Sequence, residues 1–250
     1  MTEQRIKKGD NLLFVGKRNY LIKLDQNKFT TEFGDFNLGA LVGKEWGSKV
    51  KTHLGYDFIV VPPRLPDLMR RLKRAPQIIT LKDAGIIAGL VGLSKEDIVV
   101  EAGSGSGALT IYLAGIAKHV YTYEIRKDFF DVAKGNYEKL GIKNITIKNK
   151  DITKGVDESN VDLVTLDMEF PEKAFKVAHK ALKVGGYLVI YAPIIEQVSR
   201  LRGFIDEKHF TDVETFECIL RPWNIEPPDK SRPSGHFLTH TGFLTFARKI

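Results

Sequence analysis

The stretch Ile98-Val99-Val100-Glu101-Ala102-Gly103-Ser104-Gly105-Ser106-Gly107 decides the fold of this chain. An apolar run ends in an acid, a glycine-rich turn follows, and residues 108–117 then have a helix-like composition. This order predicts a strand, a tight turn and a helix, with glycines that let the backbone approach a ligand closely. The spacing is G-x-G-x-G, which differs from the G-x-G-x-x-G of pyrophosphate-binding turns. The stretch therefore predicts a nucleotide-like site that holds no pyrophosphate.

Acids at three successive strand ends indicate which ligand this site takes. Glu101 precedes the turn, Glu124 ends a strand predicted over 120–124, and Asp151 follows strand-like residues 145–148. Glu124 is placed to accept hydrogen bonds from two ribose hydroxyls, and Asp151 from an adenine amino group. Because open α/β sheets bind ligands at this edge, the pattern predicts S-adenosylmethionine, which has no phosphate. The alternative is a tight turn with ordinary surface acids.

Composition limits the class of protein. The chain has 250 residues, of which 43% are hydrophobic and 28% charged, as is ordinary for a soluble globular protein. No apolar run approaches the roughly 20 residues that span a bilayer, and residues 1–5 lack the apolar core of a signal peptide. A single cysteine, Cys218, excludes an intrachain disulfide and a cysteine-cluster zinc site. We expect a cytoplasmic protein with no membrane partner and no metal.

The positive charge is concentrated near the N-terminus. Residues 1–74 contain 15 Lys and Arg against 8 Asp and Glu, whereas residues 75–250 contain 23 of each. The whole excess of +7 therefore precedes the glycine-rich turn. A nucleic-acid partner explains this segregation, since neutralisation of phosphates dominates such binding. A surface that serves only solubility is the alternative.

The chain divides into two predicted domains, 1–66 and 67–250. The first has short strand-like runs at 11–15, 20–24 and 29–38, which are typical of a small β-barrel or meander. Pro62-Pro63 and Pro66 mark the joint, and the basic residues 67–74 are predicted to form a short helix.

From residue 75 onward, strands and helices alternate. This alternation predicts a mostly parallel, doubly wound sheet, and the last two strands are expected to close it as an antiparallel pair. The fold class is therefore α/β, a Rossmann-like S-adenosylmethionine methyltransferase sheet with antiparallel C-terminal strands plus a small N-terminal β domain. The predicted helices are 82–90, 108–117, 128–140, 171–182 and 196–204, and the strands are 98–101, 120–124, 145–148, 161–166, 187–191, 210–221 and 239–248.

Four segments together resemble one family. They are the string Arg74-Ala75-Pro76-Gln77-Ile78-Ile79-Thr80-Leu81-Lys82-Asp83, the turn 101–107, Pro193-Ile194-Ile195-Glu196-Gln197-Val198, and the ending His240-Thr241-Gly242-Phe243-Leu244-Thr245-Phe246-Ala247-Arg248. The chain is similar to the tRNA adenine-58 N1-methyltransferases of the TrmI type from archaea and bacteria. The glycine turn is shared by many methyltransferases, whereas the first and last strings are far more specific. The resemblance covers nearly the whole chain.

The resemblance implies a cofactor site, a substrate and an assembly. Gln77, Ile78 and Ile79 would cover the methionine end of S-adenosylmethionine, and Glu124 would hold the ribose. It also implies methylation of N1 of adenine in the T-loop of tRNA, at position 58 and with 57 as a further candidate position. A homotetramer whose basic N-terminal domain helps to bind tRNA is implied as well. The remaining implied cofactor contacts are Ala102, Gly103, Ser104, Gly105, Ser106, Gly107, Ala108, Leu109, Phe129, Asp151, Ile152 and Asp167.

The expected catalytic residue is Asp167, at the end of the predicted fourth strand. A carboxylate there would accept a hydrogen bond from the exocyclic amine of adenine and offset the charge that methylation creates on the ring. It could also accept a proton. The alternative is that Asp167 caps the following turn. The family usually has proline two residues later, where this chain has Glu169, although Pro171 is retained.

Several residues are candidates for binding the substrate. Arg70, Arg71 and Arg74 belong to the basic segment, and Arg221 and His240 lie near the C-terminus, where they could contact RNA phosphates or be ordinary surface residues. A further candidate, Tyr191 at the end of the predicted fifth strand, could stack on the target base or belong to the core.

Two other functions remain open. One is a methyltransferase that acts on a protein isoaspartyl group or a corrinoid precursor, which would explain the glycine turn but not the basic β domain or the ending 240–248. The other is a non-catalytic tRNA-binding scaffold subunit, which would be expected to lose the cofactor turn. This chain keeps Gly103, Gly105, Gly107 and Glu124.

Overall fold

The computed structural model describes residues 5–73, 78–228, 230–235 and 237–250, and the chain forms two compact units. The first unit spans residues 1–71 and the second spans residues 72–250. The boundary therefore follows Arg71, whereas the sequence predicted a boundary after residue 66.

The first unit is built from antiparallel strands, which confirms the predicted small N-terminal β domain. One sheet has the strand order β2-β1-β6-β5, and β3 pairs with β4 as a separate hairpin. The elements are β1 (Asn11–Val15), β2 (Tyr20–Lys23), β3 (Lys28–Thr31), β4 (Gly34–Asn37), the 3-10 helix η1 (Gly39–Leu41), β5 (Lys49–Lys51) and β6 (Asp57–Val61).

Aromatic side chains fill the core of this unit. The ring centroids of Phe14 and Phe36 are 4.4 Å apart, and those of Phe36 and Phe58 are 4.9 Å apart in an edge-to-face arrangement. All three side chains are buried. The predicted continuous run over 29–38 was wrong, because Thr31 pairs with Gly34 and the chain reverses between them.

A short helix, α1 (Leu65–Met69), ends the first unit. Pro66 lies in its first turn, where the missing N–H would have had no helical partner. The backbone N–H of Arg64 donates to Asp67 Oδ2 at 2.9 Å and fixes this start. The prediction of a helix over 67–74 was too long, because Arg71 donates to the Leu68 carbonyl in a tight turn that ends α1.

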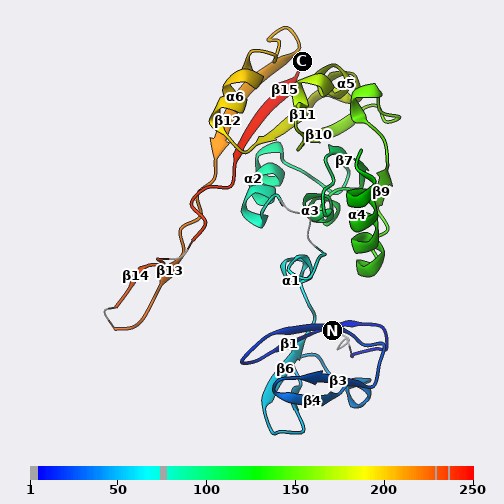
Figure 1. The fold of residues 1–250 in the computed structure, drawn as a ribbon, viewed down its shortest axis with the longest axis vertical. Coiled ribbons are helices and arrows are strands. Elements are labelled where there is room, and N and C mark those ends of the chain that lie inside the picture. Colours follow the sequence, from blue (N-terminus) through cyan, green and yellow to red (C-terminus); the bar gives the residue numbers. More distant parts are fainter. Residues whose placement is uncertain (1–4, 74–77, 229, 236) are drawn as a thin grey trace. The chain divides into compact units, whose positions relative to one another are not determined.

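The second unit contains a seven-stranded sheet with the order β12-β15-β11-β10-β7-β8-β9 (Figure 1). Neighbouring strands from β11 to β9 are parallel, and β15 is antiparallel to both β11 and β12. This confirms the predicted α/β fold with antiparallel C-terminal strands. The strands are β7 (Ile98–Ala102), β8 (His119–Tyr123), β9 (Ile145–Lys148), β10 (Val161–Leu166), β11 (Leu182–Ala192), β12 (Phe210–Glu217) and β15 (Phe243–Lys249).

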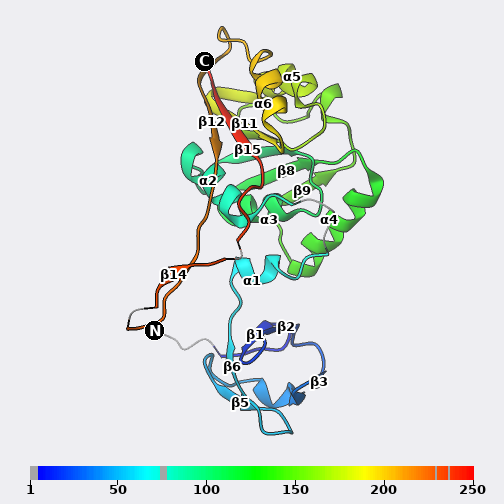
Figure 2. The same ribbon diagram turned by 60° about the vertical axis from the view of Figure 1, so that its left-hand side comes forward.

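Helices cover both faces of this sheet (Figure 2). Successive strand residues point to opposite faces, so Val99 packs in one hydrophobic cluster and Val100 in another. The cluster of Val99 includes residues of α2 (Leu81–Val91) and α3 (Ala108–Ala114), and that of Val100 includes residues of α5 (Phe175–Ala181) and α6 (Ile195–Arg202). The remaining long helix, α4 (Lys127–Leu140), is tied to α3 by a 2.8 Å bond from Tyr137 Oη to Thr110 Oγ1.

The element between β10 and β11 differs from its prediction. A single helix was expected over 171–182, but the chain forms the 3-10 helix η3 (Pro171–Ala174) and then α5. Strand β11 begins already at Leu182, because Leu182 pairs with Val161 before the register shifts and Tyr187 pairs with Leu163.

The last two strands are shorter than predicted. Strand β12 ends at Glu217 and β15 begins at Phe243, and these two residues form the last pair between them. Residues 218–242, which we call the arm, leave the sheet at that point (Figures 1 and 2). The arm contains a two-stranded pair, β13 (Trp223–Asn224) and β14 (Arg232–Pro233).

In the described part of the chain, no helix combines the length and the apolar character that crossing a membrane requires.

Candidate active site

The carboxyl ends of the parallel strands meet at one edge of the sheet and border two hollows. The larger has a volume of about 460 Å³, within the usual range for small-ligand sites. The smaller encloses about 20 Å³. Gly103, Gly105 and Asp167 line both. The larger is also lined by Ala102, Tyr123, Glu124, Ile125, Arg126, Phe129, Lys150, Asp151, Ile152, Met168 and Glu169, and the smaller by Ile78, Ile79, Glu101, Ser104, Ser106, Ala108 and Leu109.

Backbone hydrogen bonds hold the three strand ends together beyond the last strand residues. The Gly103 N–H donates to the Tyr123 carbonyl at 3.0 Å, and the Asp167 N–H donates to the Ala102 carbonyl at 2.9 Å. Gly103 has φ +88°, a conformation that side chains rarely allow. The turn of β7 is therefore fixed against both β8 and β10.

Glu124 is held in place by the turn that it faces. It is buried, its Oε2 accepts from the Gly105 N–H at 3.0 Å, and its Oε1 accepts from the Arg126 N–H at 3.0 Å. Both oxygens keep acceptor capacity, because a carboxylate oxygen accepts more than one hydrogen bond. The side chain is thus oriented toward the larger hollow, in a geometry that suits a diol.

Asp151 and Phe129 lie at the other end of the larger hollow. Asp151 Oδ1 accepts from Thr153 N at 2.9 Å and from Thr153 Oγ1 at 2.7 Å, and it caps the 3-10 helix η2 (Ile152–Lys154). These bonds are the main cause of the lowered pKa of the Asp151 carboxyl. The Arg126 guanidinium lies 3.6 Å from the centroid of the Phe129 ring. Phe129 and Ile152 give this end apolar surface against which a flat ring can pack.

Asp167 occupies the junction of the two hollows, directly after β10. Burial, and then the nearby Glu124 carboxylate, raise the pKa of Asp167 to about 7. A carboxyl group with a pKa near neutrality is suited to exchanging a proton or a hydrogen bond with a substrate.

Glu101 lies within β7 and is fully buried. Its carboxylate accepts a hydrogen bond from the hydroxyl of Thr110, which in turn accepts one from Tyr137. Burial raises the pKa of Glu101 to about 7, with smaller increases from Asp167 and Glu124. Glu101 borders the smaller hollow, so the end of the site beside Ser104 has an acceptor for a positively charged group.

Most of the predicted cofactor residues come together at these hollows, with two exceptions. Gly107 borders neither hollow, because it packs against Tyr137, whose ring would lie 2.3 Å from a Cβ atom placed there. Gln77 lies outside the described residues, as does Arg74 of the predicted substrate site.

Tyr191 lies in the core of the sheet. Only 5% of the residue is exposed, and its hydroxyl donates to the Thr241 carbonyl ahead of β15. The prediction that this ring stacks on a base is not supported, because a ring packed in the core has no open face. The alternative of a core tyrosine, which the sequence left open, matches the structure.

His240 links three segments. Its Nδ1 lies 2.6 Å from Glu217 Oε1 and its Nε2 lies 2.8 Å from the Pro193 carbonyl oxygen. Both partners only accept hydrogen bonds, so the ring must donate from both nitrogens, which raises the pKa of His240. Arg221 lies in the arm, 5.7 Å from the centroid of the Phe237 ring, and Arg70 and Arg71 are exposed in the first unit.

Sequence reasoning missed five residues that line the larger hollow: Tyr123, Ile125, Arg126, Lys150 and Met168. Four of them directly neighbour a predicted site residue in the chain, and Arg126 lies two residues after Glu124. That adjacency was the only available signal. Glu169, noted as a departure from the family, also lines this hollow. Among the described residues, no group of His, Cys, Asp and Glu is arranged to hold a metal ion.

A glycine turn after β7, a buried acid after β8 and a further acid after β10 are typical of the class of S-adenosylmethionine-dependent methyltransferases. Residues 57–229 match the family model described as the tRNA methyltransferase complex GCD14 subunit. The chain belongs to this family.

Individual relatives agree with the family. The chain is 35% identical to the tRNA (adenine(57)-N(1)/adenine(58)-N(1))-methyltransferase TrmI of Methanocaldococcus jannaschii, over 93% of this chain and 92% of that protein. Among solved structures, a SAM-dependent O-methyltransferase from Thermotoga maritima has a TM-score of 0.88 at 31% identity, covering 98% of this chain and 94% of that one. The tRNA (m1A58) methyltransferase TrmI from Aquifex aeolicus has a TM-score of 0.83 at 28% identity, covering 99% of both chains.

Proposed function

We propose that this chain transfers a methyl group from S-adenosylmethionine to N1 of adenine in the T-loop of tRNA, at position 58 and also at 57. The observation that carries the proposal is the place of Asp167 between the two hollows. The larger hollow, with Glu124 and Asp151, suits the adenosine half of the cofactor. The residues around the smaller one offer contacts to the methionine half, which needs more room than its 20 Å³. The sulfur atom joins these halves, so Asp167 lies beside the methyl group that is transferred.

Different residues of the site hold different parts of the cofactor. Glu124 accepts hydrogen bonds from the two ribose hydroxyls, and Asp151 with Ile152 and Phe129 holds the adenine. The turn from Ala102 to Leu109 surrounds the amino-acid end, with Ile78 and Ile79 against it and Glu101 facing the amino group. Bound in this way, S-adenosylmethionine supplies an electrophilic methyl group on a sulfonium ion.

Asp167 is the catalytic residue of the proposal. Its carboxylate accepts a hydrogen bond from the exocyclic amine of the target adenine, which directs N1 at the methyl group. Methylation makes the ring cationic, and a negative charge beside it lowers the free energy of the transition state. With its pKa raised to about 7, Asp167 can also take the proton that the amine loses.

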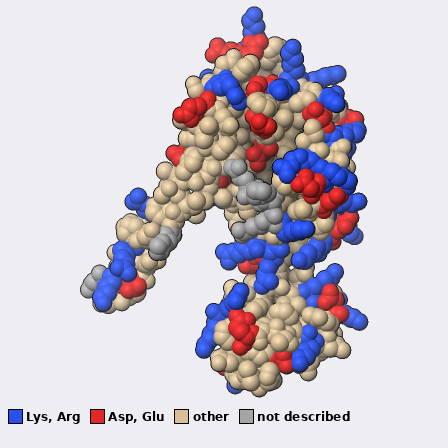
Figure 3. Space-filling view, viewed as in Figure 1, with Lys and Arg blue, Asp and Glu red and all other residues tan. Residues whose placement is uncertain are grey.

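The basic N-terminal unit is the proposed tRNA-binding region, together with Arg70, Arg71 and Arg74. Residues 1–74 carry the whole charge excess of the chain. Figure 3 shows Lys and Arg side chains on the surface of both units, so tRNA has cationic surface on each of them. Such an activity would place the chain in the cytoplasm.

A homotetramer is the proposed assembly. The arm exposes more than half the surface of each of five large apolar side chains, Ile219, Leu220, Trp223, Ile225 and Leu238. Apolar surface of this kind indicates contact with a further protein surface, and a second copy of the chain provides one.

The alternative functions are less well supported. A methyltransferase acting on an isoaspartyl group or a corrinoid precursor leaves the basic N-terminal unit unexplained. The oxygen atom that is methylated in an isoaspartyl group also carries no amine for the Asp167 carboxylate to bind. A scaffold subunit would not need the complete set of Glu101, Glu124 and Asp167 around the two hollows.

Mapping of N1-methyladenosine tests the proposal. Unmodified tRNA transcripts are incubated with the purified chain and S-adenosylmethionine, and modified positions are located by the reverse-transcription stops that the N1-methyl group causes. We expect modification at 58 and 57, and its loss in transcripts with guanosine at these positions. Transfer of label to a peptide or a corrinoid, with none to tRNA, would contradict the proposal.

A further inference from the structure

An exposed aromatic ring lies beside the mouth of the larger hollow. Phe170 follows Asp167 by three residues, and the intervening Met168 and Glu169 line that hollow. The Cα atoms of Asp167 and Phe170 are therefore separated by no more than about 11 Å, the reach of a fully extended chain. Phe170 is 38% exposed, so part of the ring is open to a ligand.

Two cations lie next to this ring. Lys173 Nζ is 4.3 Å from the centroid of Phe170, and the Arg200 guanidinium is 5.9 Å from it. Arg200 Nη2 also lies 3.9 Å from Glu172 Oε1, which connects α6 to η3. Proteins bind single-stranded nucleic acids by combining an aromatic ring, on which a base stacks, with neighbouring cations that contact phosphates.

A row of lysines continues from this ring. We call Lys154, Lys173, Lys176 and Lys180 the lysine row; all four are exposed, and none forms an ion pair with any residue that the structure describes. The last three are spaced by three and four residues, so they lie on one side of η3 and α5. Lys154 ends η2, the 3-10 helix that Asp151 caps, and Asp151 lines the larger hollow, so this end of the row lies next to that hollow.

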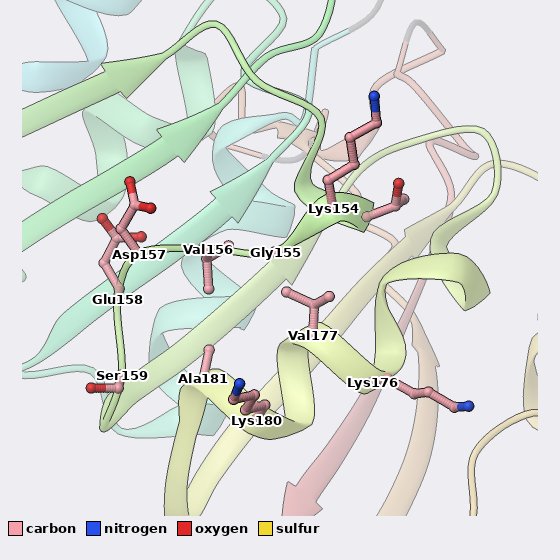
Figure 4. A pocket seen from close by; sticks show the side chains of 11 residues that line it. Lys154, Gly155, Val156, Asp157, Glu158, Ser159, Lys176, Val177, Lys180 and Ala181 are labelled. Atoms are coloured by element: carbon pink, nitrogen blue, oxygen red, sulfur yellow. The ribbon is translucent and has the colours of Figure 1, made fainter.

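Three members of the lysine row, Lys154, Lys176 and Lys180, border a separate hollow of about 520 Å³. Figure 4 shows Lys154 on one side of it and Lys176 and Lys180 on the helix opposite, with Val156 and Val177 between them. The acids at its far end are already bonded, since Asp157 Oδ2 lies 3.0 Å from Lys148 Nζ and Glu158 also pairs with Lys148. The lysines are therefore left to attract an external anion.

We propose that Phe170 stacks on a nucleotide next to the target adenine, and that the lysine row binds the phosphates of the same RNA strand. This inference rests on the proposed function and adds a tRNA-binding surface on the catalytic unit. An RNA fits better than an acidic protein for a chemical reason. The ring lies beside the residues that receive the target base, and a base extruded from a loop arrives with its neighbours unstacked.

Substitution of Phe170 tests the stacking contact. We expect Phe170→Ala to raise the Kd for tRNA about five- to a hundredfold, as is typical when a base loses an aromatic partner. Phe170→Trp keeps an aromatic ring and should bind within about threefold of the unchanged protein, whereas Phe170→Leu should resemble Phe170→Ala. Phe204→Ala removes an aromatic ring after α6 that is more exposed than Phe170, and it should change nothing. The Kd for S-adenosylhomocysteine serves as the folding control for each variant.

Neutralisation of the lysine row tests the phosphate contacts. Replacement of Lys173, Lys176 and Lys180 by glutamine should reduce the slope of log K against log salt for tRNA by about 0.7 to 0.9 for each phosphate that is no longer bound. The matched control replaces Lys118, Lys139 and Lys143 by glutamine, because these three exposed lysines precede β8 and β9 at the opposite edge of the sheet. An unchanged slope would overturn the assignment and leave the row for another anionic partner.

The results separate this inference from the proposed function. A wild-type chain that binds tRNA without methylating adenine contradicts the proposed function alone. A wild-type chain that methylates adenine, with a Phe170→Ala variant that binds tRNA equally well, overturns the stacking inference alone. A wild-type chain that does not bind tRNA overturns both.

Discussion

A Cβ atom placed on Gly103 would lie 1.8 Å from the carbonyl oxygen of Asp167. The turn that approaches the cofactor and the residue that we propose to be catalytic are therefore in direct backbone contact. The two residues come from strands that are neighbours in the sheet but are separated by more than sixty positions in the chain. The position of the Asp167 carboxylate thus depends on the absence of a side chain at residue 103.

Gly103→Ala should disable the enzyme through this contact. The added methyl group must displace the Asp167 backbone, and alanine is also strained at the positive φ of this position. We expect methyl transfer to fall by at least about 10²-fold, since misplacement of about 1 Å is enough for such a loss.

The control for this prediction is Gly135→Ala in α4, where no atom lies within 4 Å of the added group. That change should leave activity intact and stabilise the helix by about 0.5–1 kcal/mol, which thermal unfolding measures. Normal single-turnover rates in Gly103→Ala would show that the contact does not set the position of Asp167.

Asp167→Ala should separate catalysis from cofactor binding. We expect the Kd for S-adenosylhomocysteine to stay within about tenfold, while methyl transfer in single-turnover assays falls by at least about 10²-fold. Near-normal turnover would remove Asp167 as the central residue and would leave it the role of capping the turn after β10.

The pH dependence of methyl transfer should follow the ionisation of Asp167. Because its pKa is raised to about 7, the carboxyl is mostly protonated below pH 6 and mostly ionised above pH 8. We expect kcat/KM to increase with pH through this interval. The corresponding increase of kcat with pH should be shifted to lower pH values, because the bound sulfonium cation favours the ionised carboxylate.

The pKa of Glu101 is also raised to about 7, so variants are needed to show which of the two carboxyl groups causes the change of rate with pH. In the Asp167→Asn variant, the residual activity should no longer increase with pH. In the Glu101→Gln variant, the increase of activity with pH should remain. If Glu101→Gln alone removed the rise, the titrating group would be Glu101 instead.

The sequence predicted the sheet well because the hydrophobic pattern of each strand is local. Strand β9 over 145–148 and strand β10 over 161–166 have the bounds expected from their apolar runs. The arm was not predicted, because nothing local distinguishes apolar residues that pair in the sheet, such as Phe216, from those that leave it, such as Ile219. That difference depends on where the β15 partner begins.

The site was predicted to a similar extent. Glu124 and Asp167 were found because acids at parallel strand ends share one edge of the sheet. Whether Tyr191 belongs to the site or to the core was left open, since its position depends on Thr241, fifty residues away. The carbonyl oxygen of Thr241 accepts the hydrogen bond of the Tyr191 hydroxyl. A cofactor contact was expected for Gly107 because its neighbours in the turn were expected to make one. In the structure, the place that a Cβ atom of residue 107 would take is filled by the Tyr137 ring from α4.

Glu124→Gln should weaken cofactor binding without a comparable effect on the chemical step. Two ribose hydroxyls would lose a charged acceptor, which is worth about 1.5–3 kcal/mol. Calorimetric titration with S-adenosylhomocysteine measures this loss, and Glu138→Gln, on the exposed surface of α4, is the control. An unchanged Kd for Glu124→Gln would mean that the ribose does not lie at the end of β8.

Neutralisation of the basic segment should weaken tRNA binding and reduce its salt dependence. Arg70 and Arg71 are exposed, and with Lys73 and Arg74 they carry four positive charges in five residues. Glutamine at all four positions should lower the slope of log K against log salt by about 0.7–0.9 for each phosphate that the segment binds. The Kd for S-adenosylhomocysteine should stay unchanged, because Arg70, Arg71 and Lys73, the three that the structure describes, line neither hollow of the site.

The alternative for this segment is packing between subunits, so the mass of the assembly must be measured with the binding isotherms. The control replaces Lys95, Lys118, Lys139 and Lys143, which are exposed and lie around the amino ends of β7, β8 and β9. It removes the same charge from the amino edge of the sheet and should lower the slope less. Equal slopes for the two variants, on assemblies of unchanged mass, would mean that net charge alone attracts tRNA and that residues 70–74 make no specific contact with it.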